Sequence, residues 1–484
     1  MKRVKLLLIL MGVLFALNTL KAKALTISED YTLTNDLTED VIVSGKNITI
    51  DLNGHSIIAK TNGALKVTNG ANVIIKGDGI IESTNNNGVV ISNGSTLILQ
   101  SGNIKSVEFG VLVTNNSTFT MNGGIITTSD NCGVGGNGSD NDSYKNYTIN
   151  INGGVINANI KSSGYISCGV YHPNKGTVNM TGGTINSSNG AGIVQRAGTL
   201  NISGGVINTK GTSKGKVGDN KNLVTSSSVV VDKKANYPEV STLKTIISKN
   251  AQLNGSVQDI ELIGEDIDIQ LTGGIYNEEP SEESISEGFR SYKVLAGENE
   301  DKYVVVKEDE LTDEVADGMV NKTDLPEKEV SLIEKAIKSK YNLLSYYDVS
   351  LVTITKDGDI VNYISESNKD ITVKLGLPKN IPNLEKGYTR KYYVIRVHGD
   401  EVTVIKDVDY NEDGTISFKS NKFSTYAVAY EDVKDDIKTT NKNESSNPKT
   451  KDSIVIDSIM LIISLFGLAE GLIYYKNKKA CKNR

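Results

Sequence analysis

The chain of 484 residues is poor in the residues that most often mark a chemical centre. It has no tryptophan, only three histidines and only three cysteines. His55, His172 and His398 lie far apart and have no histidine or cysteine partner at zinc-site spacing, so we predict no metal site and no cofactor. Three cysteines do not build the disulfide framework of a small secreted domain. The net charge of −6 argues against nucleic acid as a partner.

Glycine, in contrast, is abundant, with 46 residues, and much of it falls in a repeated phrase of the form apolar–x–Gly–Gly–x–Ile. The clear copies begin at Met121, Ile151, Met180 and Ile202, the degenerate ones at Leu52, Ile75 and Leu99, and a late copy at Leu271. Successive copies are 22 to 24 residues apart, except for intervals of 30, 29 and 69 residues. A fixed period in this range predicts a stacked array of coils.

Short alternating segments precede the phrase, as in Thr148-Ile-Asn-Ile151 and Thr199-Leu-Asn-Ile202. They predict strands with one apolar face, and the glycines after them predict a corner with positive φ. A second marker opens a further short strand in each coil, at Gly88, Gly110, Gly133, Gly169 and Gly192, each followed by Val or Ile. Three short strands in about 22 residues, without any helical period, predict a parallel β-helix and exclude a leucine-rich repeat.

Over roughly residues 40–280 this glycine-rich repeat resembles the pectate-lyase-like superfamily. The resemblance implies a right-handed parallel β-helix, and the superfamily includes polysaccharide lyases and hydrolases. Those enzymes need clustered carboxylates, with calcium and a basic residue in the lyases. Residues 25–210 hold only 12 acidic and 10 basic residues, scattered along the repeat, with Arg196 as the lone arginine. We therefore predict no catalytic residues.

The 30- and 29-residue intervals predict two loops that project from the stack, Gly135–Lys145 and Asn157–Ile166. Insertions in a repeat array often form its binding face. Aromatic side chains gather around these loops, and the candidate ligand-binding residues are Tyr144, Tyr165, Tyr171 and His172. Tyr147 lies nearby but is expected in the core. The ligand expected at this site is a glycan, or a host or environmental protein.

Cys132 and Cys168 both begin the triplet Cys-Gly-Val at equivalent repeat positions. The register predicts that they stack in adjacent coils, close enough for a disulfide. Interior ladders of small apolar residues are common in such stacks, so reduced, stacked thiols are favoured over a disulfide. Cys481 lies in the basic tail.

Both ends of the chain indicate export. Residues 1–24 have a basic start, an apolar core and an Ala-Lys-Ala site, which predicts a secretory signal peptide. Residues 454–475 are long and apolar enough to span a bilayer, and the basic residues of the tail at 476–484 predict a cytoplasmic end.

Just before this span stands the motif Asn447, Pro448, Lys449, Thr450 and Lys451. Motif, apolar span and basic tail in that order resemble the cell-wall sorting signal of Gram-positive surface proteins. The resemblance implies a sortase that cleaves after Thr450 and links the protein to peptidoglycan. Lys451 departs from the glycine usual at its position, and without cleavage the span alone would hold the protein on the membrane.

The predicted organisation follows from these segments. It comprises a cap at 25–57, the β-helix at 58–285 with a degenerate part at 211–265, an acidic linker at 286–323, a small β-rich module at 324–432 and a linker at 433–453. The 69-residue interval leaves room for two degenerate coils.

The module, of α+β or β-sandwich type, should begin with a helix whose buried face carries Val330, Ile333 and Ile337. Asp409–Gly414 resembles half a calcium loop, but a hairpin is favoured.

Together these observations predict a mainly β protein at the cell surface, anchored to membrane or wall, that acts as an adhesin or as a rod that binds carbohydrate or protein. One alternative is a polysaccharide lyase or glycoside hydrolase. Another is a passive spacer. An acidic partner for Arg196 in a groove would favour the enzyme.

Overall fold

The computed structural model describes residues 24–59, 63–137, 146–159, 168–212, 215–216, 223–233, 243–264, 267–338 and 340–435. The chain divides into two compact units, the first of residues 1–293 with 302–309 and the second of residues 294–301 with 310–484. The predicted signal peptide, the sorting-like motif and the apolar segment at 454–475 lie outside the described residues. No helix within these described ranges has the length and apolarity to cross a bilayer.

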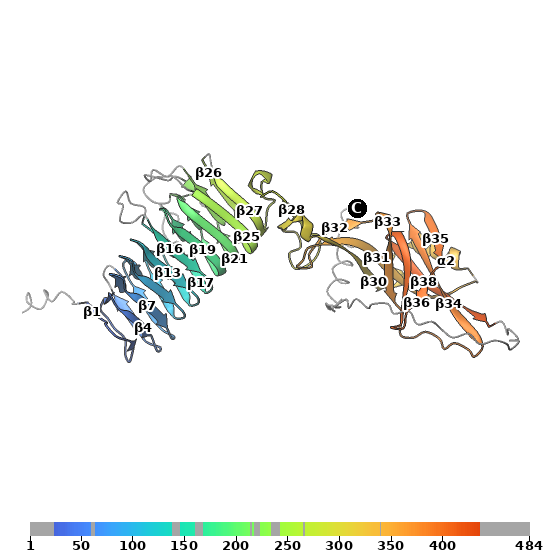
Figure 1. The fold of residues 1–484 in the computed structure, drawn as a ribbon, viewed down its shortest axis with the longest axis horizontal. Helices are drawn as coiled ribbons and strands as arrows, with labels where there is room; N and C mark the ends of the chain where they lie inside the picture. The colour runs from blue at the N-terminus through green and yellow to red at the C-terminus, as the bar shows by residue number, and fades with distance from the viewer. Residues whose placement is uncertain are drawn as a thin grey trace, which may run out of the picture. The chain divides into compact units, whose positions relative to one another are not determined.

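The first unit contains a ten-stranded, fully parallel sheet, here called sheet A (Figure 1). Each strand pairs with its equivalent in the next coil. In spatial order the strands are β1 (Leu25–Thr26), β3 (Val41–Ser44), β6 (Leu65–Thr68), β9 (Val89–Ile91), β12 (Val111–Val113), β15 (Val134–Gly135), β18 (Cys168–His172), β20 (Ala191–Gln195), β24 (Val229–Asp232) and β26 (Ile260–Ile263). Val111, Val134, Val170 and Ile193 are register partners, which confirms the Gly-Val marker.

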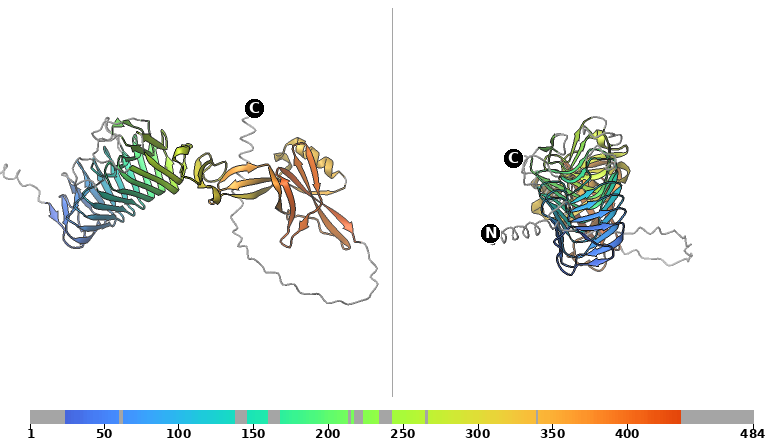
Figure 2. Two further views of the ribbon diagram at one scale, coloured as in Figure 1. Left: turned by 45° about the horizontal axis from the view of Figure 1, so that its top comes forward. Right: turned by 90° about the vertical axis from the view of Figure 1, so that its left-hand side faces the viewer.

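A 17-stranded sheet, sheet B, forms the rest of the stack and contains two parallel ladders. Ladder 1 comprises β2 (Tyr31–Thr32), β4 (Asn47–Asp51), β7 (Asn72–Lys76), β10 (Thr96–Leu99), β13 (Ser117–Met121), β16 (Tyr147–Ile151), β19 (Thr177–Ser188), β21 (Gly198–Lys210), β25 (Leu243–Asn254) and β27 (Asp268–Tyr276). Ladder 2 comprises β5 (Ser56–Ala59), β8 (Ile80–Ser83), β11 (Asn103–Ser106), β14 (Ile125–Thr128) and β17 (Val155–Asn159), and continues in the second halves of β19, β21 and β25. The stacked parallel strands fit a parallel β-helix (Figure 2).

The glycine phrase sets the corners of each coil. The second glycine of the pair has positive φ in every clear copy, at Gly124, Gly154, Gly183 and Gly205, with φ between 78° and 85°. The apolar residues that begin the phrase share one register across the coils, as Met121 pairs with Ile151 and Ile151 with Met180. All of them are buried in the interior of the stack. The predicted corner and the predicted buried row are both confirmed.

The glycines of the Gly-Val marker have a different role. A Cβ atom on Gly169 would lie 2.1 Å from Cγ2 of Ile185 in ladder 2. Gly133 and Gly192 lie equally close to Ile156 and Ile207, with a corresponding distance of 2.2 Å. Glycine is required at these positions because sheet A and ladder 2 lie so close together that no room is left for a Cβ atom.

The predicted coil count between Ile202 and Leu271 is wrong. Ile202 pairs with Ile247, and Ile247 pairs with Leu271, so the 69-residue interval holds one intermediate coil rather than two. The extra residues precede β25 in the sequence, and the described ones include the short antiparallel pair β22 (Gly215–Lys216) and β23 (Leu223–Val224). The second predicted insertion also begins later than expected, because residues 157–159 belong to β17.

Cys132 and Cys168 form a disulfide, with Cα atoms 4.6 Å apart. The predicted stacking is confirmed, but the preference for reduced thiols is wrong. Both cysteines belong to a small buried cluster with Tyr171, Ala191 and Val194, separate from the main core. Val134 and Val170, two residues after each cysteine, belong to the main core, so regular strand alternation does not hold across the Gly-Val marker.

The first unit ends on two antiparallel strands, β28 (Phe289–Lys293) and β29 (Tyr303–Lys307), which pair with each other while β29 also pairs with β27. A short 3-10 helix, η2 (Glu282–Ser284), precedes β28, and another, η3 (Glu308–Glu310), follows β29. The parallel ladder is thereby closed by strands of opposite direction, which blunts an edge that could otherwise pair with another chain.

The second unit is antiparallel. A six-stranded sheet contains β30 (Thr312–Val320), β31 (Asn342–Ile354), β32 (Ile360–Ile364), β34 (Tyr388–His398), β35 (Glu401–Ile405) and β38 (Thr425–Lys434). A three-stranded sheet contains β33 (Glu366–Gly376), β36 (Asp409–Tyr410) and β37 (Thr415–Lys422). One apolar core, which includes Val349, Val373 and Phe418, lies between the two sheets.

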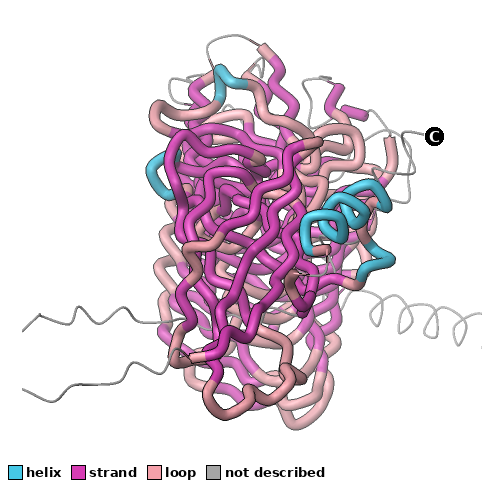
Figure 3. The backbone as a smooth tube through the Cα atoms, turned by 90° about the vertical axis from the view of Figure 1, so that its right-hand side faces the viewer, coloured by secondary structure: helices cyan, strands magenta, loops and turns pink. Residues whose placement is uncertain are grey.

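The predicted helix of this unit is α2 (Glu327–Ile337), preceded by η4 (Lys322–Asp324). It is the only α-helix among the described residues, and Figure 3 shows how strongly strand predominates. Val330, Ile333 and Ile337 pack against the six-stranded sheet, as the sequence predicts. The N-cap of the helix is Pro326, and Asp324 ends η4. The predicted hairpin at Asp409–Gly414 is confirmed by the antiparallel pairing of β36 and β37.

Candidate binding surface

The structure does not bring the four candidate ligand-binding residues together on an open surface. Tyr144 and Tyr165 lie outside the described residues. Tyr171 is 5% exposed and His172 is fully buried. Tyr171 belongs to the buried cluster around the disulfide, and His172 points into the stack. These two described residues are buried because β18 is covered on both faces, so they do not form an open surface.

His172 belongs to a polar column inside the stack. The hydroxyl of Tyr147, in ladder 1, lies 2.6 Å from Nδ1 of His172. Gln195 is the register partner of His172 in the next coil, and it donates to the carbonyl oxygens of Gly198 and Lys244 and accepts from the hydroxyl of Thr245. Burial lowers the pKa of His172 to about 3 and raises the pKa of Tyr147 well above its usual value. Both groups are therefore neutral at physiological pH.

Arg196 has an acidic partner that the sequence analysis did not identify. Its Nη2 lies 3.2 Å from Oδ2 of Asp232, and neither side chain is exposed. The two residues follow the register partners Gln195 and Val231 in neighbouring coils. Tyr171 lies close by, with its ring centre 6.0 Å from the guanidinium carbon. The sequence does not predict this ion pair because Asp232 lies in the segment predicted to be degenerate, where the register of the coils cannot be read from the repeat.

The most regular solvent-facing feature of the first unit is the outer surface of ladder 1 from β13 to β21. Side chains of these strands alternate between the core and solvent, so register partners form continuous outward rows. These rows, here called the Asn/Thr face, contain Thr118, Thr148, Thr177 and Thr199; Thr120, Asn150, Asn179 and Asn201; and Asn122, Asn152 and Thr181. None of these described residues is charged.

Hydrogen bonds between coils fix the amides of this face. Asn179 donates from Nδ2 to Oδ1 of Asn150 at 2.9 Å, and Asn201 donates to Asn179 at the same distance. In the next row Asn152 donates to Asn122, and Thr181 donates to Asn152. Each amide has two donors and an oxygen with two lone pairs, so a bond to each neighbour still leaves a donor and a lone pair for a ligand. The face is therefore a fixed array of neutral donors and acceptors at the coil spacing of about 4.8 Å.

A second chain of amides follows ladder 2 around the corner. Asn186 donates to Asn157, Asn208 to Asn186, and Asn254 to Asn208, with distances between 2.8 and 3.0 Å. The donors in both chains point in one direction along the stack, an arrangement in which each bond polarises the next. The sequence signal for the ladder 1 chain is the Thr-x-Asn triplet, as in Thr148-Ile-Asn150 and Thr199-Leu-Asn201.

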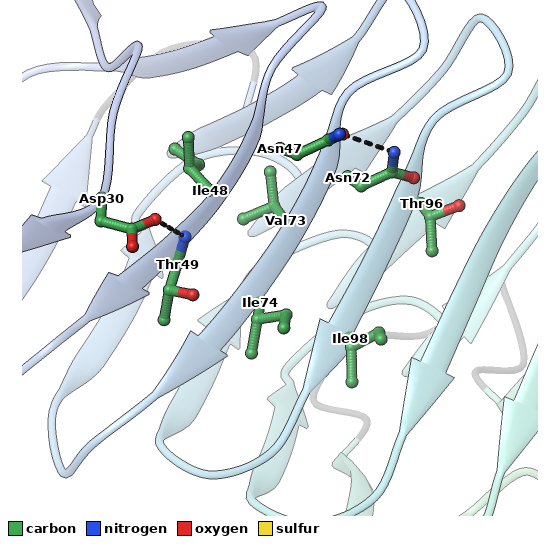
Figure 4. A pocket seen from close by; sticks show the side chains of 9 residues that line it. All are labelled: Asp30, Asn47, Ile48, Thr49, Asn72, Val73, Ile74, Thr96 and Ile98. Atoms are coloured by element: carbon green, nitrogen blue, oxygen red, sulfur yellow. Dashed lines mark hydrogen bonds between the residues drawn. The ribbon is translucent and has the colours of Figure 1, made fainter.

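Toward the N-terminal end of ladder 1 the same surface becomes a shallow hollow with an apolar floor. Ile74 and Ile98 occupy the middle row, beside Thr49 (Figure 4). Asp30 closes one side and accepts a hydrogen bond from the backbone N–H of Thr49 at 2.7 Å. Asn72 donates to Asn47 at 2.6 Å on the other side. A ligand with both apolar and hydroxyl surfaces matches this combination of side chains.

The surface offers hydrogen bonding rather than acid–base chemistry. The outward rows of the Asn/Thr face hold only hydroxyl and amide groups, and neither titrates near neutral pH. Among the described residues, no group of three or more His, Cys, Asp or Glu side chains is placed to hold a metal ion. What the arrangement can do is bind a neutral, hydroxyl-rich molecule that lies across several coils.

No protein-family model, curated protein or solved structure matches this chain.

Proposed function

We propose that the protein is a cell-surface adhesin whose first unit, a right-handed β-helix of pectate-lyase-like type, binds a neutral glycan along the Asn/Thr face. The observation that carries the proposal is the chain of amide hydrogen bonds from Asn150 to Asn201, which holds uncharged donors and acceptors in fixed positions over successive coils. A glycan presents hydroxyl groups at repeated spacing, and a preorganised surface binds it without first losing side-chain freedom.

The surface location in this proposal derives from the ends of the sequence and from the disulfide. Residues 1–24 direct export, and residues 454–475 hold the protein on the membrane unless a sortase transfers Thr450 to the wall. The Cys132–Cys168 disulfide supports export, because disulfides persist in oxidising compartments. Release of the protein from cells by a muramidase would support attachment to the wall, and recovery only with detergent would contradict it.

Binding can be tested on an array of neutral polysaccharides with the full exported chain. The variant Thr148→Lys/Thr177→Lys places two bulky cations on the Asn/Thr face. Lysine is tolerated in this row, because Lys244 is the register partner of Thr199. We expect affinity for the bound polysaccharide to fall at least about tenfold, which corresponds to about 1.4 kcal/mol.

The control is Thr127→Lys, which adds a single cation of the same kind to the outer surface of ladder 2. Its register partner in the preceding coil is already a lysine, Lys105. The control should keep its affinity. The proposal is wrong if no neutral polysaccharide binds, or if the two variants lose affinity equally.

A polysaccharide lyase or hydrolase is the second candidate, favoured by the pairing of Arg196 with Asp232. The full burial of this pair supports a structural role instead, since substrate must reach a catalytic group. Release of reducing ends or of unsaturated sugars from acidic or neutral polysaccharides would favour the enzyme. If the protein shows neither glycan binding nor turnover, the passive spacer is the remaining function.

A further inference from the structure

The second unit carries a stacked pair of tyrosines, Tyr392 and Tyr410, of which Tyr410 is exposed. Tyr392 lies on β34, and Tyr410 lies on the two-residue strand β36 of the other sheet. Their ring centres are 5.4 Å apart and their planes differ by 16°, so the rings are stacked. Tyr410 is 60% exposed, the largest value among the exposed large hydrophobic residues of the described chain. The stack therefore presents aromatic surface to solvent.

A fixed ion pair lies beside this stack. Arg390 donates from Nε and Nη2 to the two carboxylate oxygens of Asp432, each at 2.7 Å, and from Nη1 to the carbonyl oxygen of Pro382 at 2.8 Å. Its guanidinium carbon lies 4.0 Å from the ring centre of Tyr430. The bidentate contact and the ring hold the planar group in one orientation. The charges cancel, so the patch is polar without net charge.

The register brings these groups to one side of the six-stranded sheet. Tyr392 pairs with Tyr430, and Arg390 pairs with Asp432 two residues further along the same two strands. Side chains two residues apart on a strand lie on the same face. Tyr392 packs at the margin of the core between the two sheets, while Tyr410 covers it from β36. The result is an aromatic platform with hydrogen-bonding groups at its border, here called the Tyr410 platform.

We propose that the Tyr410 platform binds a sugar ring of a neutral glycan, as a second glycan site separate from the Asn/Thr face. The apolar C–H face of a pyranose can lie on an exposed aromatic ring, and its hydroxyl groups can reach the carboxylate of Asp432 and the tyrosine hydroxyls. The paired charges match an uncharged ligand better than an acidic or a basic one. Asp432 is 28% exposed and can accept a further hydrogen bond.

This site lies wholly within the second unit and shares no residue with the Asn/Thr face. In a chain without tryptophan, a stacked tyrosine pair is the available equivalent of the aromatic platforms that hold sugars. The sequence placed its candidate tyrosines around the insertions of the first unit instead. Tyr410 lies in the Asp409–Gly414 segment, for which the sequence predicts only a turn.

Isothermal titration of the full exported chain with cellohexaose and with chitohexaose tests the proposal. The variant Tyr410→Ala should lose about tenfold in affinity for the bound oligosaccharide, a loss of the size that aromatic stacking supplies. Tyr410→Phe keeps the ring and should stay within about twofold. Met319→Ala, which truncates another exposed apolar side chain of the same unit, should leave affinity unchanged.

The proposal fails if neither oligosaccharide binds, or if Tyr410→Ala binds as the unaltered chain does. A Tyr410-dependent dimer in sedimentation, without sugar binding, would overturn it in favour of a second copy as the occupant. The variant Thr148→Lys/Thr177→Lys separates this site from the one proposed for the first unit. This variant should retain the heat of oligosaccharide binding that depends on Tyr410, even where binding to the Asn/Thr face is lost.

Discussion

The hydroxyl of Tyr147 lies 2.6 Å from Nδ1 of His172 in a neighbouring coil, and both side chains are buried. The pair belongs to the interior of the first unit, where it begins the polar column that continues through Gln195 to Thr245. Because His172 is buried beside a neutral partner rather than a carboxylate, its protonation must weaken the fold.

We expect stability to depend on pH through His172. Its pKa is lowered to about 3 by burial, against 6.5 in the unfolded chain. Between these values the unfolded chain binds a proton that the folded chain does not, so stability present above pH 6.5 is lost as the pH falls. From pH 7.5 to pH 5 the loss should be about 2 kcal/mol, measured by urea unfolding at both values. His172→Gln should show a smaller loss, and an identical loss in both chains would contradict the prediction.

A methyl group at Gly169 should disturb the contact between sheet A and ladder 2. Gly169→Ala would place its Cβ 2.1 Å from Cγ2 of Ile185. We expect destabilisation of about 1–3 kcal/mol, the usual cost of overpacking. Gly318→Ala is the control, because a Cβ at Gly318 meets no atom within 4 Å.

Truncation of the opposing side chain, Ile185, gives a stricter test of the contact between residues 169 and 185. Ile185→Ala alone should cost about 2–5 kcal/mol, but together with Gly169→Ala the total should be less than the sum. Strict additivity in this double-mutant cycle would show that the contact is not the cause.

The glycine phrase carries enough information to predict the register of the stack. Met121, Ile151, Met180 and Ile202 are one apolar row in the sequence and one buried row in the structure. The prediction succeeds because strand alternation and positive-φ corners are local properties that repeat in every coil. It fails where the phrase itself lapses, since Ile247 as partner of Ile202 requires pairing across 45 residues without a phrase between them.

The candidate site was harder to predict for a physical reason. Alternation indicates which strand residues point outward, but not whether another part of the chain covers them. Tyr171 points away from the main core and is nevertheless 5% exposed, and Arg196 is fully buried with Asp232. Tyr410 is open because it lies on a two-residue strand at the margin of its sheet. Burial of outward positions depends on tertiary contacts that no local pattern contains.

The buried pair of Arg196 and Asp232 should be important for stability only as a pair. Asp232→Ala leaves a buried guanidinium without its carboxylate and should cost about 3–5 kcal/mol. The double variant Arg196→Met/Asp232→Leu removes both charges and should recover most of that loss. Thermal unfolding of the first unit measures both effects. Equal destabilisation by the single and double variants would contradict a role limited to the ion pair.

The disulfide should stabilise the coils that it joins. Cys132 and Cys168 are 36 residues apart in sequence. A crosslink that closes a loop of this length stabilises the folded state by about 3–4 kcal/mol, through the entropy that it removes from the unfolded chain. Cys132→Ala/Cys168→Ala should lower unfolding stability by an amount in this range, and reduction of the unaltered chain should reproduce it.

The same bond can be tested by chemical labelling. Alkylation of the denatured, unreduced full chain should modify Cys481 alone of the three cysteines, and prior reduction should expose all three. Modification of Cys132 and Cys168 without reduction would show that the thiols are free in the exported protein. The reduced, stacked arrangement would then be correct, and the support that the disulfide gives to an oxidising location would be lost. Cys481→Ser serves as the control, since it should show no labelling until the chain is reduced.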